Sequence, residues 1–144
     1  MACKSETKEF TTKAGEVIVV YVRQLPATKA LDLQIELLNV LGTEVFPFIS
    51  GDYNFNNILR IMAATEHTKL ADIMKRVVCM ASKDGKEVKP ALFDHEYSGE
   101  LLTVCEVFAF VCEVNFKDFF NQGLEMNERK SLEVDNQSTS EELK

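Results

Sequence analysis

The residues best suited to chemistry in this sequence are two histidines and four cysteines, and their spacing favours no reaction. His67 and His95 lie far apart, and neither stands at ligand spacing from a pair of cysteines. A zinc site needs clustered ligands such as a C-x₂₋₄-C pair, which the chain lacks. It also lacks a phosphate-binding glycine loop and a G-x-S-x-G nucleophile motif. The sequence therefore predicts no enzymatic activity, no metal and no cofactor.

The cysteines are predicted to be buried free thiols. Sequence alone leaves open a nucleophilic pair of Cys79 or Cys105 with His95, but apolar surroundings raise the pKa of a thiol and make it inert. On one helix, Cys105 and Cys112 would lie about 10.5 Å apart along the axis, too far for a disulfide. Free thiols, with Cys3 as the fourth, indicate a reducing cytoplasm.

Composition limits the kinds of partner. The chain has 144 residues, enough for one domain, and its net charge of −7 argues against nucleic acid and acidic membranes as partners. The basic residues are scattered, so they form no groove in which bases could stack. The first ten residues, MACKSETKEF, contain no apolar segment of a signal peptide.

The elements of the fold are organised around the most apolar stretch, Leu101–Phe120 (LLTVCEVFAFVCEVNFKDFF). Read as a helix, it is apolar on nearly all sides, and Phe110 falls inside its one polar stripe, formed by Thr103, Glu106, Glu113 and Lys117. The charged side chains Glu106, Glu113 and Lys117 exclude a membrane span, because each is unfavourable in the hydrocarbon core. The helix must therefore lie inside a bundle or contact another protein.

Other segments supply the rest of that bundle. Residues 9–13 and 17–22 predict a β-hairpin around Gly15, with the unbroken second arm buried on both faces. Residues 27–41 predict a helix that packs through Leu31, Ile35, Leu38 and Leu41, on a face that is widened by Leu33, Leu37 and Val40. Residues 43–55 are expected to form a loop held down by aromatic side chains. Helices are expected from about residue 54 to 62 and from 68 to 78, and a short extended piece over 88–92.

The predicted fold is mainly α: a small helical bundle with an N-terminal β-hairpin and a flexible acidic C-terminal tail. We expect residues 1–7 to be disordered, residues 8–122 to form a single helical domain, and residues 123–144 to be the flexible tail, because apolar residues become sparse after Gly123.

The aromatic residues are the best candidates for binding another protein. A single phenylalanine is more often a core residue, but this chain has more large apolar groups than a small bundle readily hides. The predicted partner-binding residues are Phe46, Phe48, Phe108, Phe110, Phe116, Phe119 and Phe120. On this interpretation Phe110→Glu would weaken binding with little effect on folding.

Two segments carry a resemblance to a known family. The first is VYVRQLPATKALDLQIELLNVLG, after the hairpin, and the second is FDHEYSGELLTVCEVFAFVCEVNFKDFF, whose closing E-V-N-F-x-D-F-F is its most specific part. Over most of residues 8–122, the chain resembles the tail assembly chaperones of long-tailed bacteriophages.

The resemblance implies a non-enzymatic protein with no catalytic residues. Such a chaperone binds the phage tape measure protein, keeps it soluble and helps bring subunits of the major tail tube protein to it. It acts in the host cell cytoplasm and is absent from the mature virion. We also expect self-association.

A structural phage protein is the alternative. A tail completion or head–tail connector protein would stay in the virion and could use the apolar strand at residues 17–22 to extend a neighbour's sheet.

Overall fold

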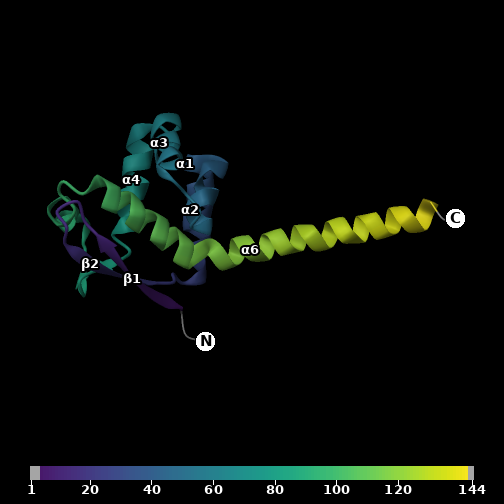
Figure 1. Ribbon diagram of the computed structural model, residues 1–144, viewed down its shortest axis with the longest axis horizontal. Helices are drawn as coiled ribbons and strands as arrows, with labels where there is room; N and C mark the ends of the chain where they lie inside the picture. Colours follow the sequence, from purple (N-terminus) through teal and green to yellow (C-terminus); the bar gives the residue numbers. More distant parts are fainter. Residues whose placement is uncertain (1–3, 143–144) are drawn as a thin grey trace.

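The computed structural model describes residues 4–142, with side chains described through residue 132. It shows a helical body with a small antiparallel sheet at one side and one long helix that extends far beyond the body (Figure 1). The predicted class, mainly α with an N-terminal hairpin, is confirmed. In chain order the elements are β1 (Ser5–Thr11), β2 (Val17–Arg23), α1 (Ala27–Leu41), the 3₁₀ helix η1 (Gly42–Val45), α2 (Phe46–Ser50), α3 (Phe55–Ala64), α4 (His67–Val78), β3 (Ser82–Lys83), β4 (Lys86–Glu87), η2 (Pro90–Leu92), α5 (Phe93–Glu96) and α6 (Leu101–Glu142).

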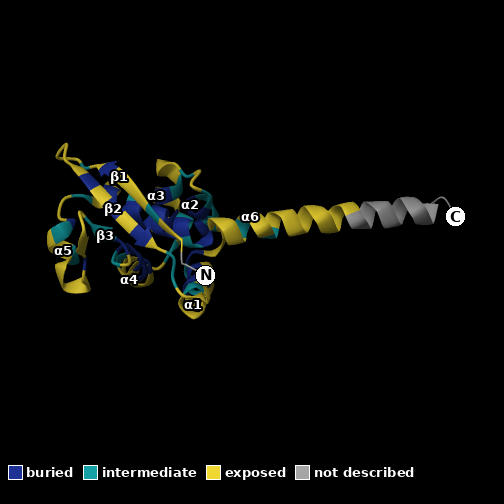
Figure 2. Ribbon diagram, turned by 90° about the horizontal axis from the view of Figure 1, so that it is seen from below, coloured by how far each residue is buried: buried dark blue, intermediate teal, exposed yellow. Residues whose placement is uncertain are grey.

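The sheet has the strand order β1-β2-β3-β4, and β1 and β2 form the predicted hairpin. Along β2, exposure alternates: Ile18, Val20 and Val22 are buried, whereas the three residues between and before them are exposed. Figure 2 shows this alternation as stripes along the hairpin. The prediction that β2 is buried on both faces was wrong, because the helices pack on only one face of the sheet.

Helix α6 is the centre of the body, as predicted for residues 101–120. Its side chains Val107, Phe108, Val111 and Cys112 are completely buried, and it contacts both hairpin strands as well as α2 and α4. Such a helix stabilises the fold chiefly through packing, since an isolated helix of this composition gains little from propensity alone. The hairpin is fixed to it by Asn115, whose Oδ1 accepts a hydrogen bond of 2.8 Å from the backbone N–H of Leu25.

Residues 42–50 form η1 and α2 where a loop was predicted. Pro47 lies in the first turn of α2, where its missing N–H breaks no helical bond, and Gly51 ends the helix with φ 79°. Phe48 is completely buried, and its ring centroid lies 5.8 Å from that of Phe108. The expectation that aromatic residues hold this segment down is therefore met, but they do so from a helix.

Gly51 is expected to be intolerant of a side chain. A Cβ at this position would lie 3.1 Å from the carboxylate of Glu113, and the positive φ disfavours any L-residue. We expect Gly51→Ala to lower the free energy of unfolding by about 1–2 kcal/mol, measured by urea denaturation. The matched control is Gly123→Ala in α6, where a Cβ would meet nothing within 4 Å. Equal losses in the two variants would contradict this account.

At both ends of the chain, regular secondary structure continues into segments that were predicted to be disordered or flexible. β1 already begins at Ser5, within the segment 1–7 that was expected to be disordered. α6 continues through residues 123–142, because these residues include many strong helix formers that offset the cost of Gly123. The division into a domain and a flexible tail stays a prediction, and residues 1–3 and 143–144 lie outside the described part.

The structure of residues 88–92 also differs from the prediction. Instead of an extended segment, Pro90–Leu92 forms η2, since the fixed φ of proline suits the first position of a helical turn.

Candidate functional site: an apolar groove between α1 and α6

The face that α1 turns to the core is only part of the predicted one. Leu33, Leu37 and Leu41 are buried, whereas Leu31, Ile35 and Leu38 are 61%, 50% and 38% exposed. Apolar residues cover most of the circumference of this helix, so its periodicity allowed either of two apolar faces to pack inward. One apolar face of α1 packs against the body, and the other forms an apolar stripe at the surface.

Two hollows lie between this stripe and α6, at the point where α6 leaves the body. The first, of about 210 Å³, lies beside Leu31, Gln34 and Phe119. The second, of about 420 Å³, is also lined by Gln34 and Phe119 and continues toward the protruding part of α6. Because the hollows share these two side chains, we treat them as one α1–α6 groove, defined by Leu31, Gln34, Leu38, Phe119, Leu124 and Met126.

The groove is apolar and open to solvent. Phe119 is 63% exposed, and Leu124 and Met126 are each 48% exposed. Contiguous apolar surface of this kind marks a contact site for another molecule, and a flexible methionine adapts to segments of different shape. The arrangement is suited to binding and offers no group for chemistry.

Four of the predicted partner-binding residues are buried in the core: Phe48, Phe108, Phe110 and Phe116, of which Phe116 also lines the first hollow. Phe110 belongs to the polar stripe of α6, but β1 covers it, and its ring centroid lies 5.9 Å from that of Phe10. Phe110→Glu is therefore expected to destabilise the fold, contrary to the interpretation from sequence.

The remaining three predicted residues meet at the groove. Phe46 and Phe120 are half-buried, with ring centroids 5.1 Å apart. Phe119 lines the same hollow and is exposed to solvent. Sequence reasoning missed the contribution of α1. The spacing of Leu31, Ile35 and Leu38 was the available signal, but it was assigned to the core.

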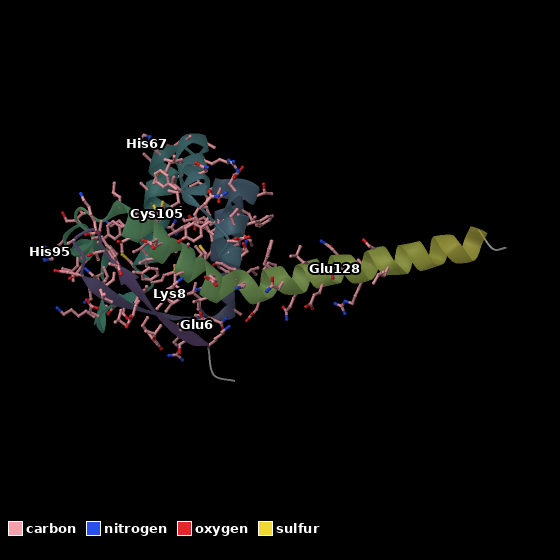
Figure 3. The ribbon with its side chains drawn as sticks, in the orientation of Figure 1. Glu6, Lys8, His67, His95, Cys105 and Glu128 are labelled. Carbon is pink, nitrogen blue, oxygen red and sulfur yellow. The ribbon has the colours of Figure 1, made fainter. Side chains whose placement is uncertain are left out.

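The two histidines and the three described thiols are placed as follows. Figure 3 shows His67 and His95 at separate edges of the body. Burial raises the pKa of the Cys105 thiol to about 11 and raises that of Cys112 as well. Within residues 4–132, no group of three or more histidine, cysteine or acidic side chains could hold a metal ion. Cys3 lies outside the described residues.

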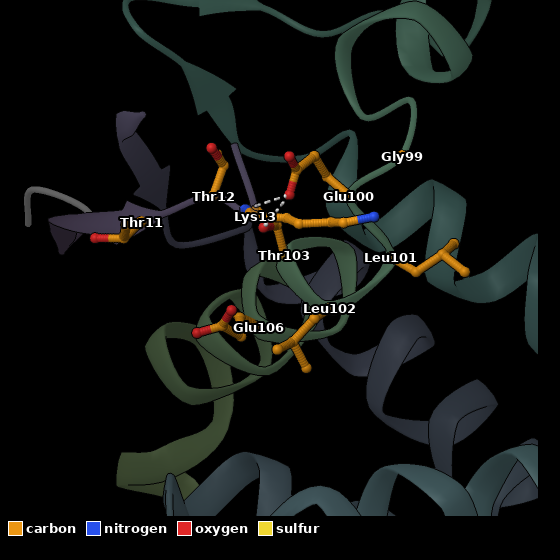
Figure 4. Close-up of a pocket in the computed structure, with 9 residues that line it drawn as sticks. All are labelled: Thr11, Thr12, Lys13, Gly99, Glu100, Leu101, Leu102, Thr103 and Glu106. Carbon is orange, nitrogen blue, oxygen red and sulfur yellow. Dashed lines mark hydrogen bonds between the residues drawn. The ribbon is translucent and has the colours of Figure 1, made fainter. Parts of the chain in front are cut away.

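A further hollow, of about 490 Å³, lies between the hairpin turn and the start of α6. Glu100, one of the two carboxylates that line this hollow, accepts a hydrogen bond of 2.8 Å from the backbone N–H of Lys13, drawn as a dashed line in Figure 4. Glu100 thus holds the turn of the hairpin to α6, at the opposite end from Asn115. We assign this hollow a structural role.

Comparison with known proteins shows the family to which the chain belongs. The chain matches the family described as "Phage tail assembly chaperone protein, TAC" over residues 16–128. The chain belongs to this family. No curated protein and no solved structure matches it. The resemblance stated from the sequence is thereby confirmed.

The match to the phage tail assembly chaperones includes the whole α1–α6 groove, whose defining residues run from Leu31 to Met126. Membership of this family implies a non-enzymatic role during tail assembly, with partners among the phage tail proteins. Of the helices in the described part of the chain, none combines the length and hydropathy that a membrane span requires.

Proposed function

We propose that this tail assembly chaperone binds apolar helical segments of the tape measure protein in the α1–α6 groove. Binding there would keep the tape measure protein soluble, and the complex would then help recruit subunits of the major tail tube protein. The supporting observation is the exposed apolar groove, which lies within the part of the chain that matches the family. We place this activity in the host cell cytoplasm and expect the chaperone to be absent from the mature virion.

The groove fits a helical ligand in its chemistry. An amphipathic helix places apolar side chains on one stripe, which can lie in the trough between two helices. The chaperone contributes aliphatic side chains from α1, Leu31 and Leu38, and an aromatic one, Phe119, from α6. The apolar side chains of such a surface discriminate weakly among the apolar side chains that they contact, which allows segments of different sequence to bind.

Co-expression with the tape measure gene of the same phage tests the proposal. The tape measure protein should be recovered in the soluble fraction, in a complex with the chaperone. If it stays insoluble and no complex is recovered, the proposal is wrong.

The alternative role as a tail completion or connector protein has one observation in its favour. The outer face of β2 exposes Val17, Val19 and Tyr21, an apolar surface that could lie against a neighbouring subunit. Mass spectrometry of purified virions separates the two roles, because a structural protein remains in the particle. Self-association stays a prediction and could use the same face.

A further inference from the structure

Gln34 is an unusual residue for its position in α1. It is only 7% exposed, and among the described side chains the other buried polar one is Thr103. The side-chain oxygen of Gln34, Oε1, is closed off from solvent and accepts no hydrogen bond within the described residues. The buried neighbours on the same helix, Leu33, Leu37 and Leu41, are all leucine.

Folding alone does not account for this glutamine. A buried carbonyl oxygen without a donor destabilises the folded state, and an apolar side chain of similar size would avoid that cost. Positions where a residue contradicts its local environment are often the ones that function requires. The location of Gln34 shows which function this could be.

Gln34 lines both hollows of the α1–α6 groove, and so does Phe119. The unpaired oxygen therefore lies beneath the surface where we propose that the tape measure segment binds. Phe119 is 63% exposed, so its ring is held loosely and can rotate on the fast timescale of surface side chains. Because the ring lies beside Gln34 in both hollows, its rotation would change the access of a ligand to Gln34.

We propose that the groove selects an apolar helical segment that carries one hydrogen-bond donor, which displaces Phe119 and donates to Oε1 of Gln34. This inference rests on the proposed function and specifies its ligand. The donor would be the amide of asparagine or glutamine, the hydroxyl of serine or threonine, or the ammonium of lysine. Charge complementarity disfavours an acidic side chain, because the carbonyl oxygen is partially negative and the chaperone has a net charge of −7.

The test compares Gln34→Leu with the natural chain, using overlapping 20-residue peptides that cover the tape measure protein of the same phage. The tightest-binding peptide is also made with leucine in place of its donor residue. The natural chaperone should bind the donor peptide about tenfold more tightly than the leucine version. Gln34→Leu should lose or reverse this preference.

Stability gives a second readout. Gln34→Leu should raise the melting temperature of the free chaperone, since it removes an unpaired polar group from the interior. The matched control is Gln122→Leu, the same exchange at an exposed position of α6 outside the groove, which should leave the peptide preference unchanged.

Three results would overturn the inference. If Gln34→Leu lowers the melting temperature, Gln34 serves the fold rather than the ligand. If peptides bind but both chains show the same preference, the donor is irrelevant, and the proposed function still stands. If no peptide binds to either chain, the inference and the proposed groove function fail together.

Discussion

Replacing Phe108 with glutamate is expected to unfold the chaperone. Phe108 is completely buried in the middle of α6, and its ring lies edge-on to Phe48. Loss of a buried phenylalanine costs about 3–5 kcal/mol, and a buried carboxylate without a partner adds to that. A domain of this size has a total stability of about 5–15 kcal/mol, so little would remain. Circular dichroism and urea denaturation would measure the loss.

The matched control is Phe119→Glu, the same exchange on the same helix three turns further along. Phe119 is 63% exposed, so the free energy of unfolding should change by no more than about 0.5–1 kcal/mol. If the two variants were equally stable, α6 would not be packed as the structure has it.

Placing charges in the groove is expected to abolish binding of the tape measure protein while leaving the fold intact. In the double variant Leu38→Asp with Phe119→Asp, two exposed apolar side chains are lost, one from each side of the groove. Each would contribute about 1.5–3 kcal/mol when buried by a ligand, and each carboxylate would also have to be desolvated. We therefore expect the affinity to fall by at least about 100-fold, measured by calorimetry with a tape measure fragment.

A double variant on α3 controls for general loss of apolar surface. Phe55 and Leu59 are 61% and 46% exposed and do not line the groove. Phe55→Asp with Leu59→Asp should bind the fragment as the natural chain does. Equal losses in the two double variants would mean that binding is not localised to the groove.

The sequence correctly predicted the elements whose residue pattern is compatible with only one type of secondary structure. β-branched residues on both sides of Gly15 determined the hairpin, and a long apolar run interrupted by a narrow polar stripe determined α6. It also led to the family, through residues that lie within the matched segment 16–128. The ends of the helices were harder to predict, because helix-forming and helix-breaking residues lie close together near Pro47 and Gly123.

The surface residues were harder to predict because the patterns there were ambiguous. α1 is apolar around most of its circumference, so hydrophobic spacing could not decide whether Leu33 or Leu31 faces the core. Phe110 lies among polar residues on its own helix, and only the hairpin, far away in sequence, covers it. In β2, the unbroken run of apolar residues did not indicate that one face of the strand is exposed to solvent.

The sequence by itself thus determined the kind of protein: a mainly helical, acidic chain organised around one very apolar helix. The tertiary structure alone decided which apolar side chains are core and which form the groove. The physical reason is that burial depends on what packs against a residue, and for α1 and α6 those neighbours come from distant segments. Gln34 is the clearest case, because only the packing of α1 beside α6 shows that its side-chain oxygen is buried without a hydrogen-bond donor.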